Sequence, residues 1–193
     1  AIAHAAFSVR ALAMHHETTS LAYVIREAPR VNIDEARLAA LGLPPGPWLR
    51  RVRKPTPDEE PAIEIDGVRH DLAALRADLL VERPGACVAY LTDFLLDDAA
   101  MERLVPALRG CDTLVCECQY AEADAALAAR NYHMTSTQVA NLARRAGVGR
   151  LILFHLSARY RLPEWRAMLA SARAIFPHAS FPAGWDAEPA AGS

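Results

Sequence analysis

The sequence predicts an α/β fold, because three short apolar runs alternate with segments that have helical periodicity. Residues 87–91 (CVAYL), 113–117 and 151–155 are each typical of a buried strand. Helical patterns follow these runs over residues 97–109, 121–130, 137–146 and 163–175. Such an alternation of strand and helix favours a sheet with parallel strands and helices packed on it.

Two further strands are expected before this core. Residues 7–14 alternate apolar and polar side chains, and residues 21–26 (LAYVIR) form a second apolar run. The polar segment 17–20 between them predicts a hairpin.

The helices of the core have recognisable ends. Asp97 and Asp98 lie at the start of the helix over 97–109, where acidic side chains suit the helix dipole, and Pro106 predicts a kink or break. Gly147 predicts the end of the helix over 137–146, and Pro163 predicts the start of the last helix.

Residues 29–80 differ from this core, because they are rich in proline and charge. A helix capped near Asp34 is expected to end at Gly42, and residues 43–47 (LPPGP) exclude regular structure. Asp66-Gly67 predicts a small hairpin. The segment also carries a run of four basic side chains, Arg50, Arg51, Arg53 and Lys54.

Polar residues end the three core strands in a way that predicts a site. Asp93 follows the first strand, Glu117 ends the second, and His155 ends the third. Ligands of open α/β sheets gather outside the carboxyl ends of the strands. Carboxylate and imidazole together suit zinc or a similar divalent ion. His16 at another strand end and His133 in a polar loop are further candidates.

Length and composition bound the class of protein. The chain has 193 residues, 52% of them hydrophobic and 23% charged, which fits a globular domain. A net charge of −2 gives no overall support for nucleic-acid binding, which would need a local basic patch. No apolar segment has membrane length, so a cytoplasmic protein that contacts no membrane is expected. The four cysteines are expected to be buried thiols, with a metal pair at Cys116 and Cys118 as the alternative.

Two longer stretches carry a family resemblance. YHMTSTQ (132–138) and LILFHLSARY (151–160), with GLPPGP (42–47) and the spacing from His16 through LAYVIRE, resemble RNase Z, the tRNA 3′-processing endonuclease of the metallo-β-lactamase superfamily. The likeness covers residues 12–182 in order. It implies an αββα sandwich that contains two zinc ions.

The resemblance implies a role for each candidate residue. Asp93 would bridge the two zinc ions, and His16 and His155 would each bind one of them. His133 would act at the scissile phosphate and its leaving group, with Glu117 orienting it. Residues 29–80 would be a protruding arm that holds tRNA through Arg50, Arg51, Arg53 and Lys54, and the regular core would span 87–182. A homodimer is also implied.

The family's His-x-His-x-Asp-His motif does not occur in this sequence. The chain is therefore expected to form the C-terminal part of one metallo-β-lactamase-like domain, with fewer than two zinc ions or none, and to be inactive alone. Three alternatives remain open: an RNase Z-type phosphodiesterase that acts on tRNA precursors, a hydrolase of small phosphodiesters or other esters, and a non-catalytic RNA-binding remnant.

Overall fold

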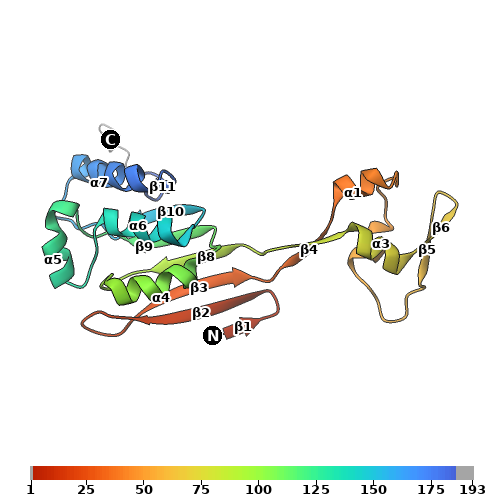
Figure 1. The fold of residues 1–193 in the computed structure, drawn as a ribbon, viewed down its shortest axis with the longest axis horizontal. Helices are drawn as coiled ribbons and strands as arrows, with labels where there is room; N and C mark the ends of the chain where they lie inside the picture. The colour runs from red at the N-terminus through yellow and green to blue at the C-terminus, as the bar shows by residue number, and fades with distance from the viewer. Residues whose placement is uncertain (1, 186–193) are drawn as a thin grey trace, which may run out of the picture. The chain divides into compact units, whose positions relative to one another are not determined.

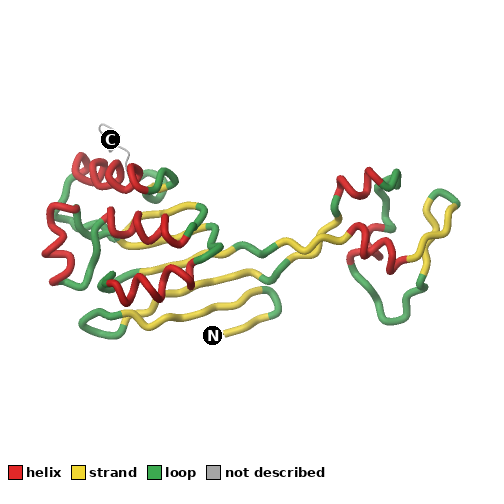
Figure 2. Tube along the Cα trace, in the orientation of Figure 1, coloured by secondary structure: helices red, strands yellow, loops and turns green. Residues whose placement is uncertain are grey.

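The computed structural model describes residues 2–185, and the chain divides into two compact units. The first unit contains Ala1–Glu27 and Ala86–Ser193, and the second contains Ala28–Gly85. Each unit has its own hydrophobic core. Figure 2 shows the helices, strands and loops of both. The segment 29–80, which the sequence sets apart, lies within the second unit.

A seven-stranded mixed sheet forms the first unit, in the order β1-β2-β3-β8-β9-β10-β11. The pairs β1–β2, β2–β3 and β3–β8 are antiparallel, and β8, β9, β10 and β11 run parallel. The bounds are β1 Ile2–His4, β2 Phe7–Met14, β3 Ser20–Glu27, β8 Cys87–Leu91, β9 Thr113–Glu117, β10 Arg150–Phe154 and β11 Ala179–Ser180. The predicted strands and the predicted hairpin are confirmed.

Helices cover one face of this sheet. Three helices lie side by side on it: α4 (Asp98–Leu108), α6 (Ser136–Ala146) and α7 (Leu162–Ile175). Helix α6 lies in the middle and packs against both α4 and α7. Figure 1 shows α4 and α6 in front of the strands, with their axes roughly along the strand direction. Between β9 and α6 lie a short 3-10 turn (Glu122–Asp124) and α5 (Ala125–Arg130). None of the helices within residues 2–185 is long and apolar enough to cross a membrane.

The opposite face of the sheet is apolar and open among the described residues. Its side chains on the central strands β3 and β8 are between 37% and 41% exposed: Leu21, Tyr23, Ile25, Val88 and Tyr90. Apolar sheet faces are normally packed against another layer. The described residues therefore correspond to one α layer and one β layer of the expected αββα sandwich.

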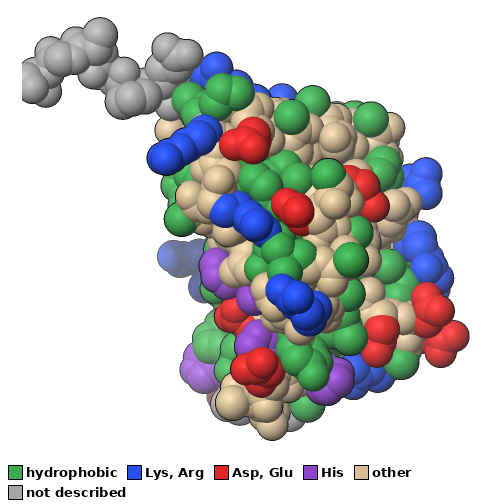
Figure 3. Space-filling view, turned by 90° about the vertical axis from the view of Figure 1, so that its left-hand side faces the viewer, with side chains coloured by type: hydrophobic (Ala, Val, Ile, Leu, Met, Phe, Trp, Pro, Cys, Tyr) green, Lys and Arg blue, Asp and Glu red, His purple; other side chains and the backbone are tan. Residues whose placement is uncertain are grey.

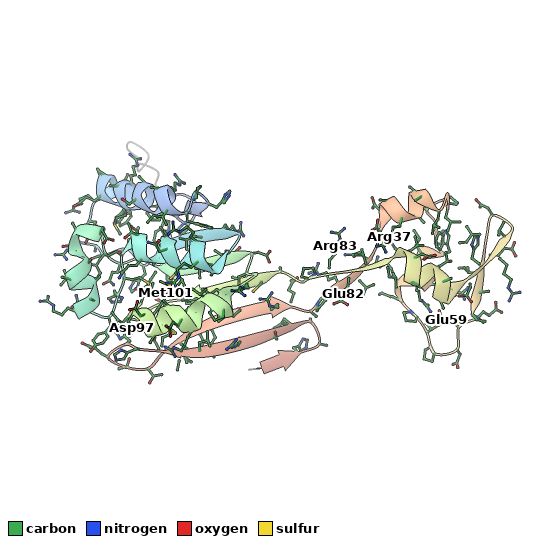
Figure 4. The ribbon with its side chains drawn as sticks, viewed as in Figure 1. Arg37, Glu59, Glu82, Arg83, Asp97 and Met101 are labelled. Carbon is green, nitrogen blue, oxygen red and sulfur yellow. The ribbon has the colours of Figure 1, made fainter. Side chains whose placement is uncertain are left out.

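Local sequence signals explain where the core helices begin and end. The Asp97 carboxylate accepts the Ala100 N–H at 2.7 Å, so it caps α4 (Figure 4). Gly147 ends α6 with φ +66°, which only glycine adopts readily. The predicted break at Pro106 is wrong, because α4 continues to Leu108. Pro106 lies so close to the end that few helical hydrogen bonds are affected.

The second unit contains two short antiparallel strand pairs and three helices. Strand β4 (Arg30–Ile33) pairs with β7 (Leu80–Arg83), and β5 (Ala62–Ile65) pairs with β6 (Val68–Asp71). The helices are α1 (Glu35–Ala40), α2 (Leu49–Arg53) and α3 (Leu72–Leu79). Val52, Leu72 and Leu79 are almost fully buried at their centre. Arg76 of α3 forms an ion pair with Glu59. Figure 4 labels Glu59 and, on α1, Arg37.

The α4 cap gives a first prediction. Asp97→Ala removes the acceptor for the Ala100 N–H, so we expect the free energy of unfolding to fall by about 1 kcal/mol in urea titrations. Asp97→Asn should lose much less, because asparagine caps helices nearly as well. Equal losses from the two variants would contradict a capping role.

Candidate metal centre

Four side chains of metal-binding or proton-transferring type converge at the carboxyl end of the sheet. Asp93 follows β8, Glu117 ends β9, His155 follows β10, and His133 lies in the loop before α6. One donor atom from each of the four lies within 4.8 Å of all the others. Figure 3 shows histidine and acidic side chains gathered at this end of the unit.

The strand register brings the first three together. In β9 and β10, Glu117 is paired with Phe154, so the residue after Phe154 lies beside the Glu117 carboxylate. His155 Nδ1 is 3.0 Å from Glu117 Oε2 and 3.5 Å from Asp93 Oδ1. The strand-end pattern in the sequence therefore corresponds to one spatial cluster.

Glu117 is the centre of this cluster and is fully buried. Its Oε2 accepts the Nδ1–H of His133 at 2.7 Å as well as that of His155. Its Oε1 accepts the backbone N–H of Phe94 at 3.2 Å. The carboxylate thus fixes both imidazole rings and the loop that carries Asp93. With Nδ1 of His133 engaged, its Nε2 is the nitrogen left for other contacts.

The same contacts set the charges. Burial opposes ionisation of Glu117, yet the hydrogen bonds from His133 and His155 outweigh it and hold the pKa of Glu117 below its usual value of 4.5. The hydrogen bond to Glu117 raises the pKa of His155 above its usual 6.5, against partial burial and with help from the charges of Glu117 and Asp93. The resting cluster is an ionised carboxylate with imidazole N–H donors around it.

Unusual backbone conformations occur at this site. Asp93, His155 and Tyr132 have φ values of +52°, +56° and +57°. These values lie in the left-handed region of backbone conformation, which residues other than glycine rarely adopt. Asp66, in the turn between β5 and β6, is the one further non-glycine example among residues 2–185. Strained backbone of this kind clusters at functional sites, where the surrounding structure holds it.

His16 lies beside the cluster, outside the four residues whose donor atoms approach one another. Its ring centroid is 5.5 Å from that of His133 and 5.8 Å from that of Tyr132. The carbonyl of His15 accepts the N–H of Leu95 at 2.8 Å, which ties the end of β2 to the loop of Asp93. The structure therefore brings His16 next to the predicted site.

Sequence reasoning missed three residues that support the cluster. Gln119 Nε2 lies 3.4 Å from His155 Nε2, and the Thr92 hydroxyl donates to Asp93 Oδ2 at 2.9 Å. Tyr132 packs edge-on to His15 at a centroid distance of 5.1 Å. Gln119 alternates with Glu117, and Thr92 and Tyr132 directly precede Asp93 and His133, so adjacency was the available signal.

The four basic residues lie in the second unit, on and just after α2. Arg50, Arg53 and Lys54 are exposed and line, with Ile33 and Leu49, a pocket of about 370 Å³. Arg51 is separated from them, because it donates to the Glu60 carbonyl at 3.0 Å. The four basic residues that were predicted to act as one group are therefore divided. Three of them line one pocket, and Arg51 is held by a hydrogen bond to the backbone.

The cysteines do not extend the site. All four are free and buried, which confirms the expected thiols. Burial raises the pKa of Cys116 far above its usual value, with a smaller contribution from the Glu117 charge. A thiol held neutral in this way is a poor metal ligand.

The donor chemistry of the cluster fits a divalent cation. Asp93 offers a half-exposed carboxylate, and His155 offers an imidazole with 38% of its side chain exposed. Glu117 has no exposed surface, and its oxygens are engaged by both histidines and the Phe94 N–H. Asp93 and His155 are therefore the accessible ligands, and Glu117 supports them from behind.

Comparison with solved structures defines the fold class. The metallo-β-lactamase fold protein YhfI from Bacillus subtilis superposes with a TM-score of 0.52 at 16% identity, over 93% of this chain and 48% of that protein. Human tRNase Z, short form, gives 0.50 at 15% identity, over 94% of this chain and 42% of that protein. The chain has the metallo-β-lactamase fold over nearly all of its own length, and it matches somewhat less than half of the length of each of those proteins, consistent with a C-terminal half.

The sequence relatives are more specific, although no family model matches the chain. Ribonuclease Z of Deinococcus radiodurans is 51% identical over 177 residues, covering 92% of this chain and 52% of that protein. Ribonuclease Z of Synechococcus sp. is 37% identical over 178 residues, covering 89% and 52%. The chain is a homologue of Ribonuclease Z, which confirms the resemblance, and it spans about half the length of these relatives.

The pKa shifts at Glu117 and His155 give a second prediction, for the metal-free chain. A lowered carboxyl pKa adds stability above pH 4.5 that is lost as pH falls through the folded value, and a raised histidine pKa adds stability below pH 6.5 that is lost as pH rises. Both contributions are present between about pH 4.5 and 6.5. Glu117→Gln should therefore cost most in that window, measured by urea unfolding over a pH series.

Glu102→Gln, at an exposed position of α4, is the matched control and should show no such window. An NMR titration adds a second readout, because Glu117→Gln should lower the pKa of His155 more than Asp93→Asn does. A cost of Glu117→Gln that is the same at every pH, or the reverse order of the two variants, would contradict the assignment.

Proposed function

We propose that this chain supplies one half of the metal centre of a phosphodiesterase of Ribonuclease Z type, which cleaves the 3′ trailer from tRNA precursors. One observation carries the proposal: Asp93, Glu117, His133 and His155 meet at the carboxyl end of the sheet, two of them on left-handed backbone. The identity to proteins named Ribonuclease Z supports RNA as the substrate class.

Asp93 and His155 would hold the cation in this half, with His16 as a further ligand. A bound zinc ion would polarise a phosphodiester and lower the pKa of a bound water. Asp93 presents Oδ1 toward His155, while Oδ2 is held by the Thr92 hydroxyl. That hydrogen bond orients the carboxylate before any ligand arrives.

Proton transfer falls to His133. Glu117 engages Nδ1 of His133, so Nε2 is the ring nitrogen left to face the substrate. A protonated Nε2 could donate to the oxygen that leaves the scissile phosphate, which makes His133 the general acid. The lowered pKa of Glu117 serves this role, because an ionised carboxylate accepts the Nδ1–H of His133 and holds the ring in place.

The second half of the centre would come from a domain part that packs on the open sheet face. The exposed apolar side chains of β3 and β8 offer a surface for a second β layer. The His-x-His-x-Asp-His ligands implied by the family would lie in that part. This chain alone should then bind zinc weakly and cleave no RNA, and full cleavage of a tRNA precursor by the isolated chain would refute the division.

The arm would bind RNA through phosphate contacts. Arg50, Arg53 and Lys54 present three positive charges around one pocket, whereas the net charge of the chain is −2. Basic side chains on phosphates position RNA without reading its sequence. Because the net charge of the chain is negative, RNA binding would need a local basic patch of this kind.

Zinc titration gives the third prediction. Asp93→Asn should lower the zinc affinity of the chain by at least about tenfold, and Glu117→Gln by about 10- to 100-fold through loss of imidazole orientation. Asp93→Asn suits the test, because asparagine tolerates the left-handed backbone as well as aspartate does. Glu102→Gln is the control in calorimetry and should bind as the parent chain does.

The pH dependence of zinc affinity follows from His155. A cation must replace the proton that the raised pKa of His155 retains, so affinity should fall as pH decreases through that pKa. Zinc affinity that is unchanged in Asp93→Asn, or that rises on acidification, would contradict the proposed ligands.

RNA binding gives the fourth prediction. Replacing Arg50, Arg53 and Lys54 together by Ala should weaken binding of a tRNA precursor and reduce the slope of log affinity against log salt by about 2 to 3. Arg51→Ala is the matched control, because that guanidinium binds the Glu60 carbonyl. Loss of binding in the control alone would contradict the arm assignment.

A further inference from the structure

A pair of buried thiols lies at the end of the sheet opposite the metal centre. Cys87 opens β8, and Cys111 lies in the connection from α4 to β9. Their side chains are 0% and 2% exposed, and their Sγ atoms are 2.7 Å apart. A disulfide bond measures ~2.05 Å, so the two sulfurs need to approach by only roughly 0.7 Å.

The backbone around the two cysteines holds them in this position. The Cys87 N–H donates to the Asp112 carboxylate at 2.6 Å, and the Asp112 N–H donates to the Cys87 carbonyl at 2.9 Å. The Cys111 N–H donates to the Leu108 carbonyl at 3.0 Å at the end of α4. Both chain segments are therefore fixed by hydrogen bonds that do not involve the thiols.

We propose that Cys87 and Cys111 form an oxidative modification site that a hydroperoxide converts to a disulfide. One sulfur attacks the peroxide oxygen, the O–O bond breaks, and a sulfenic acid forms with release of water. The second sulfur then attacks the sulfenic sulfur, the S–S bond forms, and the S–O bond breaks to release a second water. Two thiols lose two electrons and two hydrogens to one molecule of hydrogen peroxide.

The environment selects the oxidant. Burial raises the pKa of the Cys111 thiol to about 12, and its hydrogen bond with Cys87 adds to the rise. Little thiolate is present at neutral pH, so the reaction is slow. A small neutral peroxide can reach a thiol with 2% exposure more readily than a bulky disulfide reagent.

The cross-link would stabilise the element that carries Asp93. The loop it closes contains β8, Asp93 and α4, and a bond across that loop restricts the unfolded chain. Asp93 follows the opposite end of β8, away from Cys87. Oxidation should therefore raise the melting temperature without changing zinc affinity.

The test is oxidation of the full chain with hydrogen peroxide, followed by alkylation after unfolding and peptide mapping by mass spectrometry. We expect one linked peptide pair that contains Cys87 and Cys111, lighter by two hydrogens than the reduced pair. Cys116 and Cys118, also buried, are the internal control and should be alkylated. The melting temperature should rise on oxidation and return after reduction, and Cys111→Ala should show no such shift.

Three outcomes would overturn the site: no link between Cys87 and Cys111, a link between Cys116 and Cys118 in its place, or an equal rise in melting temperature in Cys111→Ala. Cys87→Ala serves in place of Cys111→Ala if that variant does not fold. The peptide map of the parent chain is decisive in either case.

Discussion

The buried carboxylate of Glu117 is the contact on which the rest of the site depends. It accepts hydrogen bonds from His133, His155 and the backbone of Phe94, which arrive from three different parts of the chain. A buried charge is costly unless it is paired and hydrogen-bonded, and here every partner is a residue of the candidate centre or its neighbour. The charge that β9 places at its end therefore fixes the orientation of both imidazoles and the position of the Asp93 loop.

The sheet explains why such a cluster forms at that edge. Strands β8, β9 and β10 are parallel, so their carboxyl ends meet, and each carries one polar side chain to the same place. Helices α4 and α6 bury the other face, which leaves the polar ends and an apolar sheet face accessible. An apolar face beside this cluster is what a sheet that packs against a second β layer would present.

The sequence was most informative where short-range patterns decide the structure. The strands at 87–91 and 113–117, the Gly147 helix end and the hairpin at Asp66-Gly67 depend on local periodicity and turn chemistry, and they are confirmed. Pairing of β4 with β7 was not predicted, because the two strands are short and the residues between them form most of the second unit.

The site itself was predictable as a set of residues but not as an arrangement. Strand ends identified Asp93, Glu117 and His155, and the family resemblance added roles for His16 and His133. The double hydrogen bond of Glu117, the left-handed backbone at Tyr132 and the separate partner of Arg51 depend on tertiary contacts that no spacing reveals. Registers between distant strands and loop conformations are set by packing, which a single sequence does not display.

The most direct test of the central claim is anomalous diffraction at the zinc edge from crystals of this chain grown with zinc. We expect a metal peak about 2.0–2.2 Å from donor atoms of Asp93 and His155, with Glu117 still hydrogen-bonded to His133. A peak elsewhere in the chain, or one that Glu117 coordinates after releasing His133, would contradict it.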